Sequence, residues 1–268
     1  MTRPTPERVP VLHQTAPDAD SARKPSLRLR WRESVTMLEY AAVRLSGDLT
    51  DHWPRGDGHP VVVLPGFLAG PLSTRLLRDV LGRLGYRPFD WGLGRNLGYR
   101  PTMTEDLAEL VADVQQRCDG QKVSLIGWSA GGVYAREVAR EVPERVRSVI
   151  TLGSPIRGNH RANHATWLWD VFNRNLDATE IMSDAARIGR AEPLTVPTTC
   201  IYSRHDGVVA WECCTSVPAP RTENVEVRST HFGFGHNLET LHVIADRLAQ
   251  PQDQWRPYQT GSSRPLRQ

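Results

Sequence analysis

The 268-residue chain has little of what a membrane span, a disulfide framework or a nucleic-acid site requires. Its longest apolar run, 61–65 continued by 67–69, is far shorter than the roughly 20 residues that cross a bilayer. The 4 cysteines have no CxxC spacing, and the N-terminus lacks the apolar core of a secretory signal, so we expect a cytoplasmic protein with reduced thiols. A net charge of +3 is too small to indicate a nucleic-acid partner. With 39% hydrophobic residues and a mean hydropathy of −0.44, the composition predicts a globular protein without integral membrane association.

The two ends of the chain differ in composition from the middle. Residues 1–26 are rich in proline and poor in large apolar side chains, which predicts a disordered N-terminal arm. Residues 251–268 are rich in Pro, Gly, Ser and Gln and form an expected C-terminal tail. The main domain is therefore expected over 27–250. Near its start, an apolar stripe over 31–45 predicts a helix that packs on the domain or lies over its mouth.

From residue 61 the pattern alternates between strands and helices. The β-rich runs are 61–64, 86–91, 122–127, 146–152, 198–203 and 224–228. Helical stripes lie between them, with caps expected at Ser73, at Thr102 in a capping box with Glu105, and at Asn237. This alternation predicts an α/β fold with a mainly parallel sheet of about six strands, helices on both faces, and a ligand site beyond the carboxyl ends of the strands.

One connection is longer than a crossover helix requires. Some 45 residues separate the runs that end at Leu152 and start at Thr198, and we expect a lid insertion at about 156–197. Trp167, Trp169 and Phe172 give this insertion an apolar face. His160 and His164 lie four residues apart there, but no third ligand is evident, so they do not predict a metal site.

The most specific motif is the sequence GWSAGG at 127–132, which lies between the strand KVSLIG and the helix that follows. G-x-S-x-G in this context is a nucleophile elbow, a sharp turn that exposes a serine at the edge of the sheet. The glycines at both ends are needed because a side chain at either position would collide with neighbouring elements. Ser129 is thus the candidate nucleophile.

With this elbow and three further segments, the chain resembles the α/β-hydrolase family, and more closely its compact lipases and esterases. The other segments are VVVLPGF at 61–67, TLGSPIRG at 151–158, and the pair IYSRHDGVV and STHFG at 201–209 and 229–233. The resemblance covers about 61–248. It departs from many lipases in the first turn, where Pro65 precedes Gly66 in place of histidine.

The resemblance implies a catalytic triad in the order serine, acid, histidine. Asp206 follows a strand at the position of the acid, while Asp177 and Asp184 are weaker candidates because no strand positions them. The last loop offers two bases. His231 lies at the loop apex and is favoured over His236, which directly precedes a helix cap.

The resemblance also implies an oxyanion hole. Its donors are expected to be the backbone N–H groups of Ala130 and Phe67, with Leu68 as the alternative to Phe67. Further residues are candidates for lining the substrate pocket: Leu68, Trp91, Asn96, Trp128, Trp167 and His236.

These features predict a serine hydrolase that cleaves carboxylic esters through an acyl-enzyme on Ser129, with no metal or organic cofactor. The substrate is expected to be a small-molecule or lipid ester, and the apolar lid favours a medium or long acyl chain. Two alternatives stay open. An acyltransferase would use the same triad with an alcohol acceptor, and a non-catalytic binding protein would keep only the fold.

Overall fold

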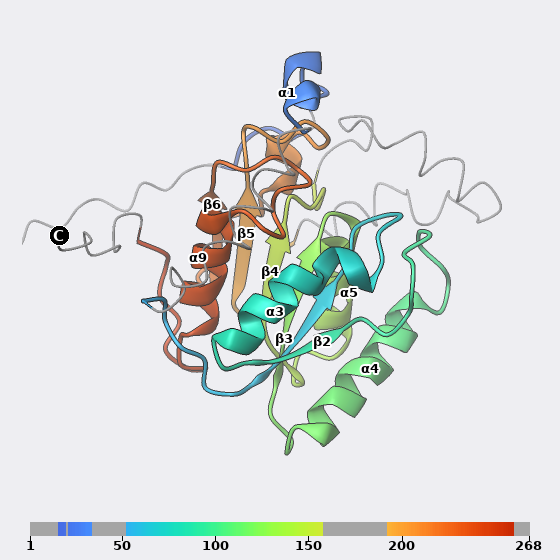
Figure 1. The fold of residues 1–268 in the computed structure, drawn as a ribbon, viewed down its shortest axis with the longest axis vertical. Coiled ribbons are helices and arrows are strands. Elements are labelled where there is room, and N and C mark those ends of the chain that lie inside the picture. Colours follow the sequence, from blue (N-terminus) through green and yellow to red (C-terminus); the bar gives the residue numbers. More distant parts are fainter. Residues whose placement is uncertain (1–15, 20, 34–51, 158–191, 260–268) are drawn as a thin grey trace, which may run out of the picture.

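The computed structural model describes residues 16–19, 21–33, 52–157 and 192–259. Within these ranges the chain forms one sheet of six parallel strands in the order β2-β1-β3-β4-β5-β6 (Figure 1). The strands are β1 (Pro60–Leu64), β2 (Arg87–Asp90), β3 (Val123–Trp128), β4 (Val146–Leu152), β5 (Thr198–Tyr202) and β6 (Thr222–Glu226). All six lie in the runs predicted from sequence, with ends shifted by at most a few residues.

Helices cover both faces of the sheet, as the alternating pattern predicts. The helices α3 (Arg75–Arg83) and α9 (Leu238–Leu248) pack on one face, and α4 (Met103–Arg117) and α5 (Ala130–Glu141) pack on the other. Alternate strand residues divide between the two cores: Val61 and Val63 join the first, while Val62 and Leu64 join the second. Because every β1 side chain is buried, this strand reads as a continuous apolar run.

Three shorter helices complete the described elements. The helix α1 (Leu27–Arg32) precedes the first strand, and the 3₁₀ helices η3 (Pro71–Thr74) and η5 (Trp211–Cys214) follow β1 and β5. In Figure 1, α1 lies at one end of the molecule above the loops of the C-terminal half. No helix within the described ranges is long and apolar enough to cross a membrane.

Of the three helix caps predicted from sequence, one is confirmed and two are wrong. The Asn237 cap is confirmed, because its side chain accepts from the Thr240 backbone N–H at 3.1 Å. The Ser73 cap is wrong: Ser73 lies inside η3, and its hydroxyl donates to the Gly70 carbonyl. The capping box is also wrong, since the Thr102 hydroxyl donates to Asp106, the residue after Glu105.

Part of the expected disordered arm lies against the domain. Ala19 is only 7% exposed, and its carbonyl lies 4.0 Å from the Cys213 Sγ in η5. Ala22 packs against the small cluster of Val209, Ala210, Cys213 and Cys214. The composition could not show these contacts.

Several sequence predictions fall outside the described residues. These are most of the expected lid, including Trp167 and the histidine pair 160 and 164, and most of the helix expected over 31–45. The boundaries of arm, domain, lid and tail stay predictions.

Candidate active site

Ser129 occupies a strained turn between β3 and α5. Its backbone φ is 53° and ψ is −121°, a conformation that L-residues rarely adopt. The turn is tight because a Cβ placed on Gly127 would lie 2.3 Å from the Gly132 Cα, and one on Gly131 would lie 2.5 Å from the Leu64 carbonyl oxygen. Backbone atoms cannot move aside as side chains do, so both positions require glycine. The partly buried Ser129 hydroxyl is therefore presented at the carboxyl edge of the sheet, as the elbow motif predicts.

A chain of hydrogen bonds joins Ser129 to a buried carboxylate. The Ser129 Oγ lies 3.1 Å from the His231 Nε2, and the His231 Nδ1 lies 2.7 Å from the Asp206 Oδ2. The other Asp206 oxygen accepts the backbone N–H groups of Val208 and Val209, both at 2.8 Å. The carboxylate is thus held in place, and it orients the imidazole so that Nε2 faces the hydroxyl.

The surroundings of His231 act on its pKa in opposite directions. Burial disfavours the charged ring and lowers the pKa, but the negative charge of Asp206, its hydrogen bond and the charge of Glu33 together outweigh burial, so the pKa is raised above 6.5. This environment stabilises an imidazolium at the moment when His231 would take a proton from Ser129.

The backbone of the histidine loop is held from two sides. The Trp128 indole N–H donates to the His231 carbonyl at 3.0 Å, and the Glu33 carboxylate accepts the His231 N–H at 2.9 Å. Trp128 is 8% exposed and belongs to the core, so it supports the base rather than lining an open pocket. His236 lies later in the loop, where its N–H donates to the Gly233 carbonyl. The imidazole within reach of Ser129 and Asp206 is that of His231.

The turn after β1 lies beside the nucleophile. A Cβ on Gly66 would be 3.3 Å from the Ser129 Cβ, so Phe67 follows at the rim of the site. The Leu68 N–H donates to the Asn96 carbonyl at 2.7 Å, which removes Leu68 as an oxyanion donor. Ala130 is the first residue of α5, where a backbone N–H has no partner within the helix. Phe67 and Ala130 stay the predicted donor pair.

The loop after β2 supports this turn, and the side chains of Trp91 and Asn96, predicted to line the pocket, are buried in it. Asn96 is fully buried, and its side-chain amide donates to the Pro65 carbonyl at 3.0 Å. Arg95 donates to the Leu68 carbonyl at 2.8 Å. Trp91 is 1% exposed in the core, with its indole N–H bonded to Gly94. The buried side chains of Trp91 and Asn96 and the exposed side chain of Arg95 thus satisfy backbone carbonyls of these turns, a role that spacing along the sequence does not show.

Sequence reasoning missed Glu33. The residue follows α1 in a segment where only an apolar stripe is visible, and no motif relates it to residues some 200 positions away. Its partners are backbone N–H groups, which leave no trace in the sequence.

A second arrangement of aspartate, histidine and serine lies at the opposite edge of the sheet. The His59 Nδ1 is 2.5 Å from the Asp57 Oδ1, and its Nε2 is 3.0 Å from the Ser124 Oγ. His59 and Ser124 are 1% and 0% exposed, and Ser124 lies within the extended strand β3 instead of a turn before a helix. No substrate carbonyl can reach this serine, so the arrangement is structural.

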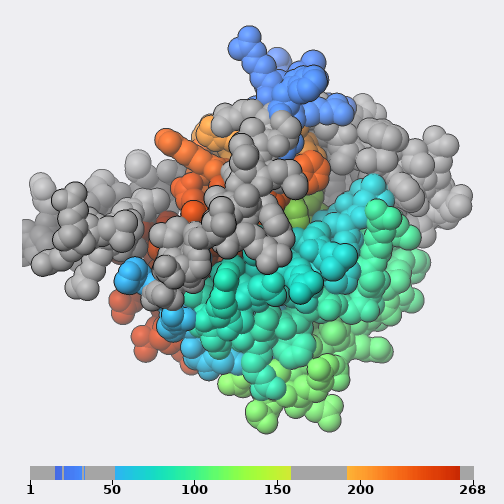
Figure 2. Space-filling model, viewed as in Figure 1, coloured from blue at the N-terminus to red at the C-terminus, as the bar shows by residue number. Residues whose placement is uncertain are grey.

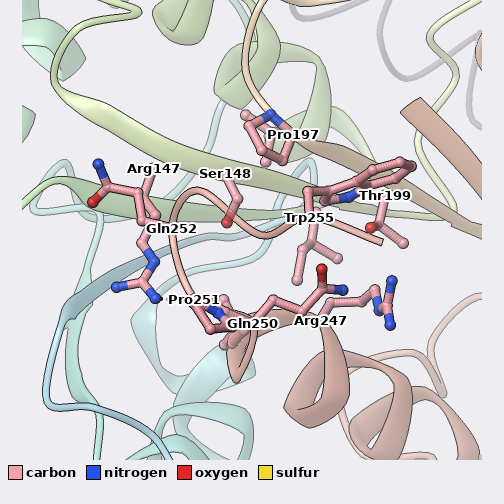
Figure 3. Close-up of a pocket in the computed structure, with 12 residues that line it drawn as sticks. Arg147, Ser148, Pro197, Thr199, Arg247, Gln250, Pro251, Gln252 and Trp255 are labelled. Carbon is pink, nitrogen blue, oxygen red and sulfur yellow. Dashed lines mark hydrogen bonds between the residues drawn. The ribbon is translucent and has the colours of Figure 1, made fainter. Parts of the chain in front are cut away.

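A cavity also lies at the amino edge of the sheet, away from Ser129. Figure 3 shows Arg147 and Ser148 of β4 on one side and the segment after α9, with Gln250 and Trp255, on the other. Arg147 is paired with Asp57 at 2.8 Å, and Arg247 with Glu223 at 3.0 Å, so acidic partners already neutralise both guanidinium groups that line the cavity. The part of the chain that the structure describes holds no cluster of three or more His, Cys, Asp or Glu side chains suited to a metal.

The parallel sheet, the elbow on β3 and the helices on both faces define an α/β-hydrolase fold. Residues 60–192 match the family model described as alpha/beta hydrolase fold, and the chain is an α/β-hydrolase.

Individual proteins that are similar to the chain are named as a hydrolase or as lipases. The human protein named serine hydrolase BPHL is 27% identical over 128 residues, a match that covers 44% of this chain and 44% of that protein. The chain thus aligns with less than half of that relative's length. Aspergillus fumigatus lipase B is similar in structure, with a TM-score of 0.56 and 16% identity over 93% of this chain and 63% of that one. Bacillus licheniformis lipase BlEst2 has a TM-score of 0.53 and 18% identity over 73% and 92%. At these identities, the two solved structures show the fold alone.

Proposed function

We propose that the protein is a serine hydrolase that cleaves carboxylic esters. The observation that carries this proposal is the continuous relay from Ser129 through His231 to Asp206, with contacts of 3.1 and 2.7 Å and the serine in an elbow conformation. A serine hydroxyl is a weak nucleophile at neutral pH, and this relay supplies the base and the orienting carboxylate that it needs. The lipases that share the fold support an ester as substrate.

The reaction follows from the geometry in two halves. The Ser129 Oγ attacks the ester carbonyl carbon while its proton passes to the His231 Nε2, and the carbonyl oxygen becomes an oxyanion held by the Phe67 and Ala130 N–H groups. The bond to the alcohol oxygen then breaks, and that oxygen takes the proton from His231. A water molecule repeats the attack on the acyl-enzyme: its proton passes to His231 and then returns to the departing Ser129 oxygen. The products are the alcohol and the free acid.

The rim of the site favours an apolar acyl group. Phe232 is 51% exposed directly after the base, with its ring 5.7 Å from the imidazole. Leu72 is 82% exposed on η3, which follows the oxyanion turn. Apolar side chains at this edge gain free energy when an acyl chain covers them, at about 25 cal/mol per Å² of buried surface. We therefore propose medium or long acyl esters as the preferred substrates.

Labelling with a fluorophosphonate tests this function, because such a probe reacts with an activated serine. We expect one label per chain, located on Ser129 by peptide mass spectrometry and lost in Ser129→Ala. Hydrolysis of p-nitrophenyl esters should then be faster for octanoyl than for acetyl esters. A folded protein that takes up no label would reject the enzymatic proposal, and product esters formed with added alcohol in preference to free acid would show an acyltransferase.

A further inference from the structure

The carboxylate of Glu33 joins the two loops that carry the acid and the base. Its Oε1 accepts the N–H of Gly207 at 2.8 Å and of His231 at 2.9 Å, and its Oε2 accepts the N–H of Phe232 at 3.0 Å. Gly207 directly follows Asp206, so one side chain bonds to the backbone next to both partners of the relay. Among the described residues, each of these amides donates to this carboxylate alone.

A separate observation fixes the segment that delivers Glu33. A Cβ placed on Gly207 would lie 2.5 Å from the Leu29 carbonyl oxygen and 2.8 Å from the Arg30 nitrogen. The backbone of α1 therefore lies directly on the acid loop, at an approach that only glycine permits. In Figure 2 the helix, in blue, stands out at this end of the molecule.

Glu33 also contributes charge. Two carboxylates act on the imidazole of His231: Asp206 from the acid loop and Glu33 from the end of α1. Among the described residues, the other hydrogen-bond and ring contacts of the imidazole are with the Ser129 hydroxyl and the rings of Phe232 and Phe234, which carry no charge. Proton transfer from the serine makes the imidazole cationic, and a second negative charge nearby stabilises that state.

We propose that Glu33 is a positioning residue of the active site, which ties the acid loop to the histidine loop and stabilises the imidazolium of His231. The inference rests on the proposed serine hydrolase function and extends it to a segment that precedes the first strand of the sheet in the chain. Because Glu33 follows α1, any displacement of that helix would loosen the relay.

Substitution of Glu33 by glutamine tests the proposal. Glu33→Gln keeps the shape and one acceptor oxygen but removes the charge, and Glu105→Gln, at an exposed carboxylate on α4, is the matched control. We expect the kcat of Glu33→Gln for a p-nitrophenyl ester to fall at least tenfold, with the fluorophosphonate labelling rate falling in parallel. The acid limb of the kcat profile should move to lower pH, because a less stabilised imidazolium loses its proton at lower pH. If Glu33 served only to hold the fold together, Glu33→Gln would lower the folded fraction, measured by circular dichroism, and the acid limb of its kcat profile would stay at the wild-type pH.

The outcomes separate the two proposals. Wild-type rates and an unmoved acid limb in folded Glu33→Gln, or an equal change in Glu105→Gln, would overturn the role of Glu33 while the labelled wild type still supports the hydrolase. Absence of label on the wild type would reject the hydrolase itself. If Glu33→Gln does not fold, the variant Gly207→Ala tests the proposal instead. The added Cβ would force α1 away from the acid loop, so we expect the same loss of rate and the same shift of the acid limb of the pH profile. Wild-type behaviour of this variant would refute the proposal.

Discussion

Replacement of Asp206 by asparagine should change the hydrogen position on His231 while leaving the fold intact. One Asp206 oxygen accepts two backbone N–H groups at 2.8 Å, so the asparagine must place its carbonyl oxygen there. Its NH₂ group then faces the His231 Nδ1 at the present 2.7 Å contact, and that nitrogen has to accept. The remaining ring hydrogen moves to Nε2, which would donate to Ser129 and could no longer take its proton.

The size of the effect follows from this inverted tautomer. In the Ser-His-Asp template the corresponding change lowers kcat about 10⁴-fold, equivalent to about 5.4 kcal/mol of transition-state stabilisation. We expect a similar loss for Asp206→Asn in p-nitrophenyl ester hydrolysis and in fluorophosphonate labelling, with a melting temperature close to wild type because every hydrogen bond of the side chain can be kept. Asp253→Asn, at an exposed residue, is the control. A loss below about tenfold in the folded variant would refute the tautomer argument.

Three further predictions concern the base, the rim and the opposite edge of the sheet. Replacing His231 with alanine should lower kcat by at least about 10³-fold, whereas His236→Ala should keep most activity, and the reverse ranking in the same ester assay would show that the base is misassigned. Phe232→Ala should raise KM for an octanoyl ester several-fold with little change for an acetyl ester, and equal changes for both would argue against an apolar rim. Burial raises the pKa of Asp57, but the hydrogen bonds from His59 and from a nearby arginine outweigh it and lower this pKa to about 2. The ionised carboxylate therefore stabilises the folded state fully above pH 3.8, and this stabilisation is lost as the pH falls. Because this carboxylate is half exposed, Asp57→Asn should lower the free energy of unfolding in urea by at most about 1 kcal/mol at neutral pH. This difference in free energy between the variant and the wild type should become smaller as the pH falls from about 5 to about 3. A difference that does not depend on pH would contradict this account.

The fold was accessible from the sequence because its signals are local. Each strand is a short apolar run, each helix an apolar stripe, and the order of the two specifies a parallel sheet. The elbow is also recognisable locally, as a G-x-S-x-G motif between a strand and a helix. Gly127 is required by the backbone of Gly132 a few residues away, whereas Gly131 is required by the Leu64 carbonyl on the adjacent strand. Asn237 was recognisable as a cap for the same reason, while Ser73 and Thr102 show that a serine or threonine before a helix can bond elsewhere.

The supporting contacts of the site were not accessible in this way. Trp91 and Asn96 looked like pocket residues because their loop leaves the carboxyl end of a strand, but both side chains turn inward to bond with backbone carbonyls. Trp128 likewise bonds to the His231 carbonyl across 103 positions of sequence. Pairings of a side chain with a distant peptide group carry no residue pattern, because every residue has the same backbone.

The amino-acid sequence by itself determined the strand and helix order, the elbow at Ser129 and the candidate acid and base, since each depends on neighbours in the chain. Only the tertiary structure decided which histidine meets the serine, that the Leu68 amide is already bonded, and that Glu33 bridges the two catalytic loops. The physical reason is that hydrogen bonds and charge act over a few ångströms in space, and the folded backbone alone fixes which distant residues come within that range.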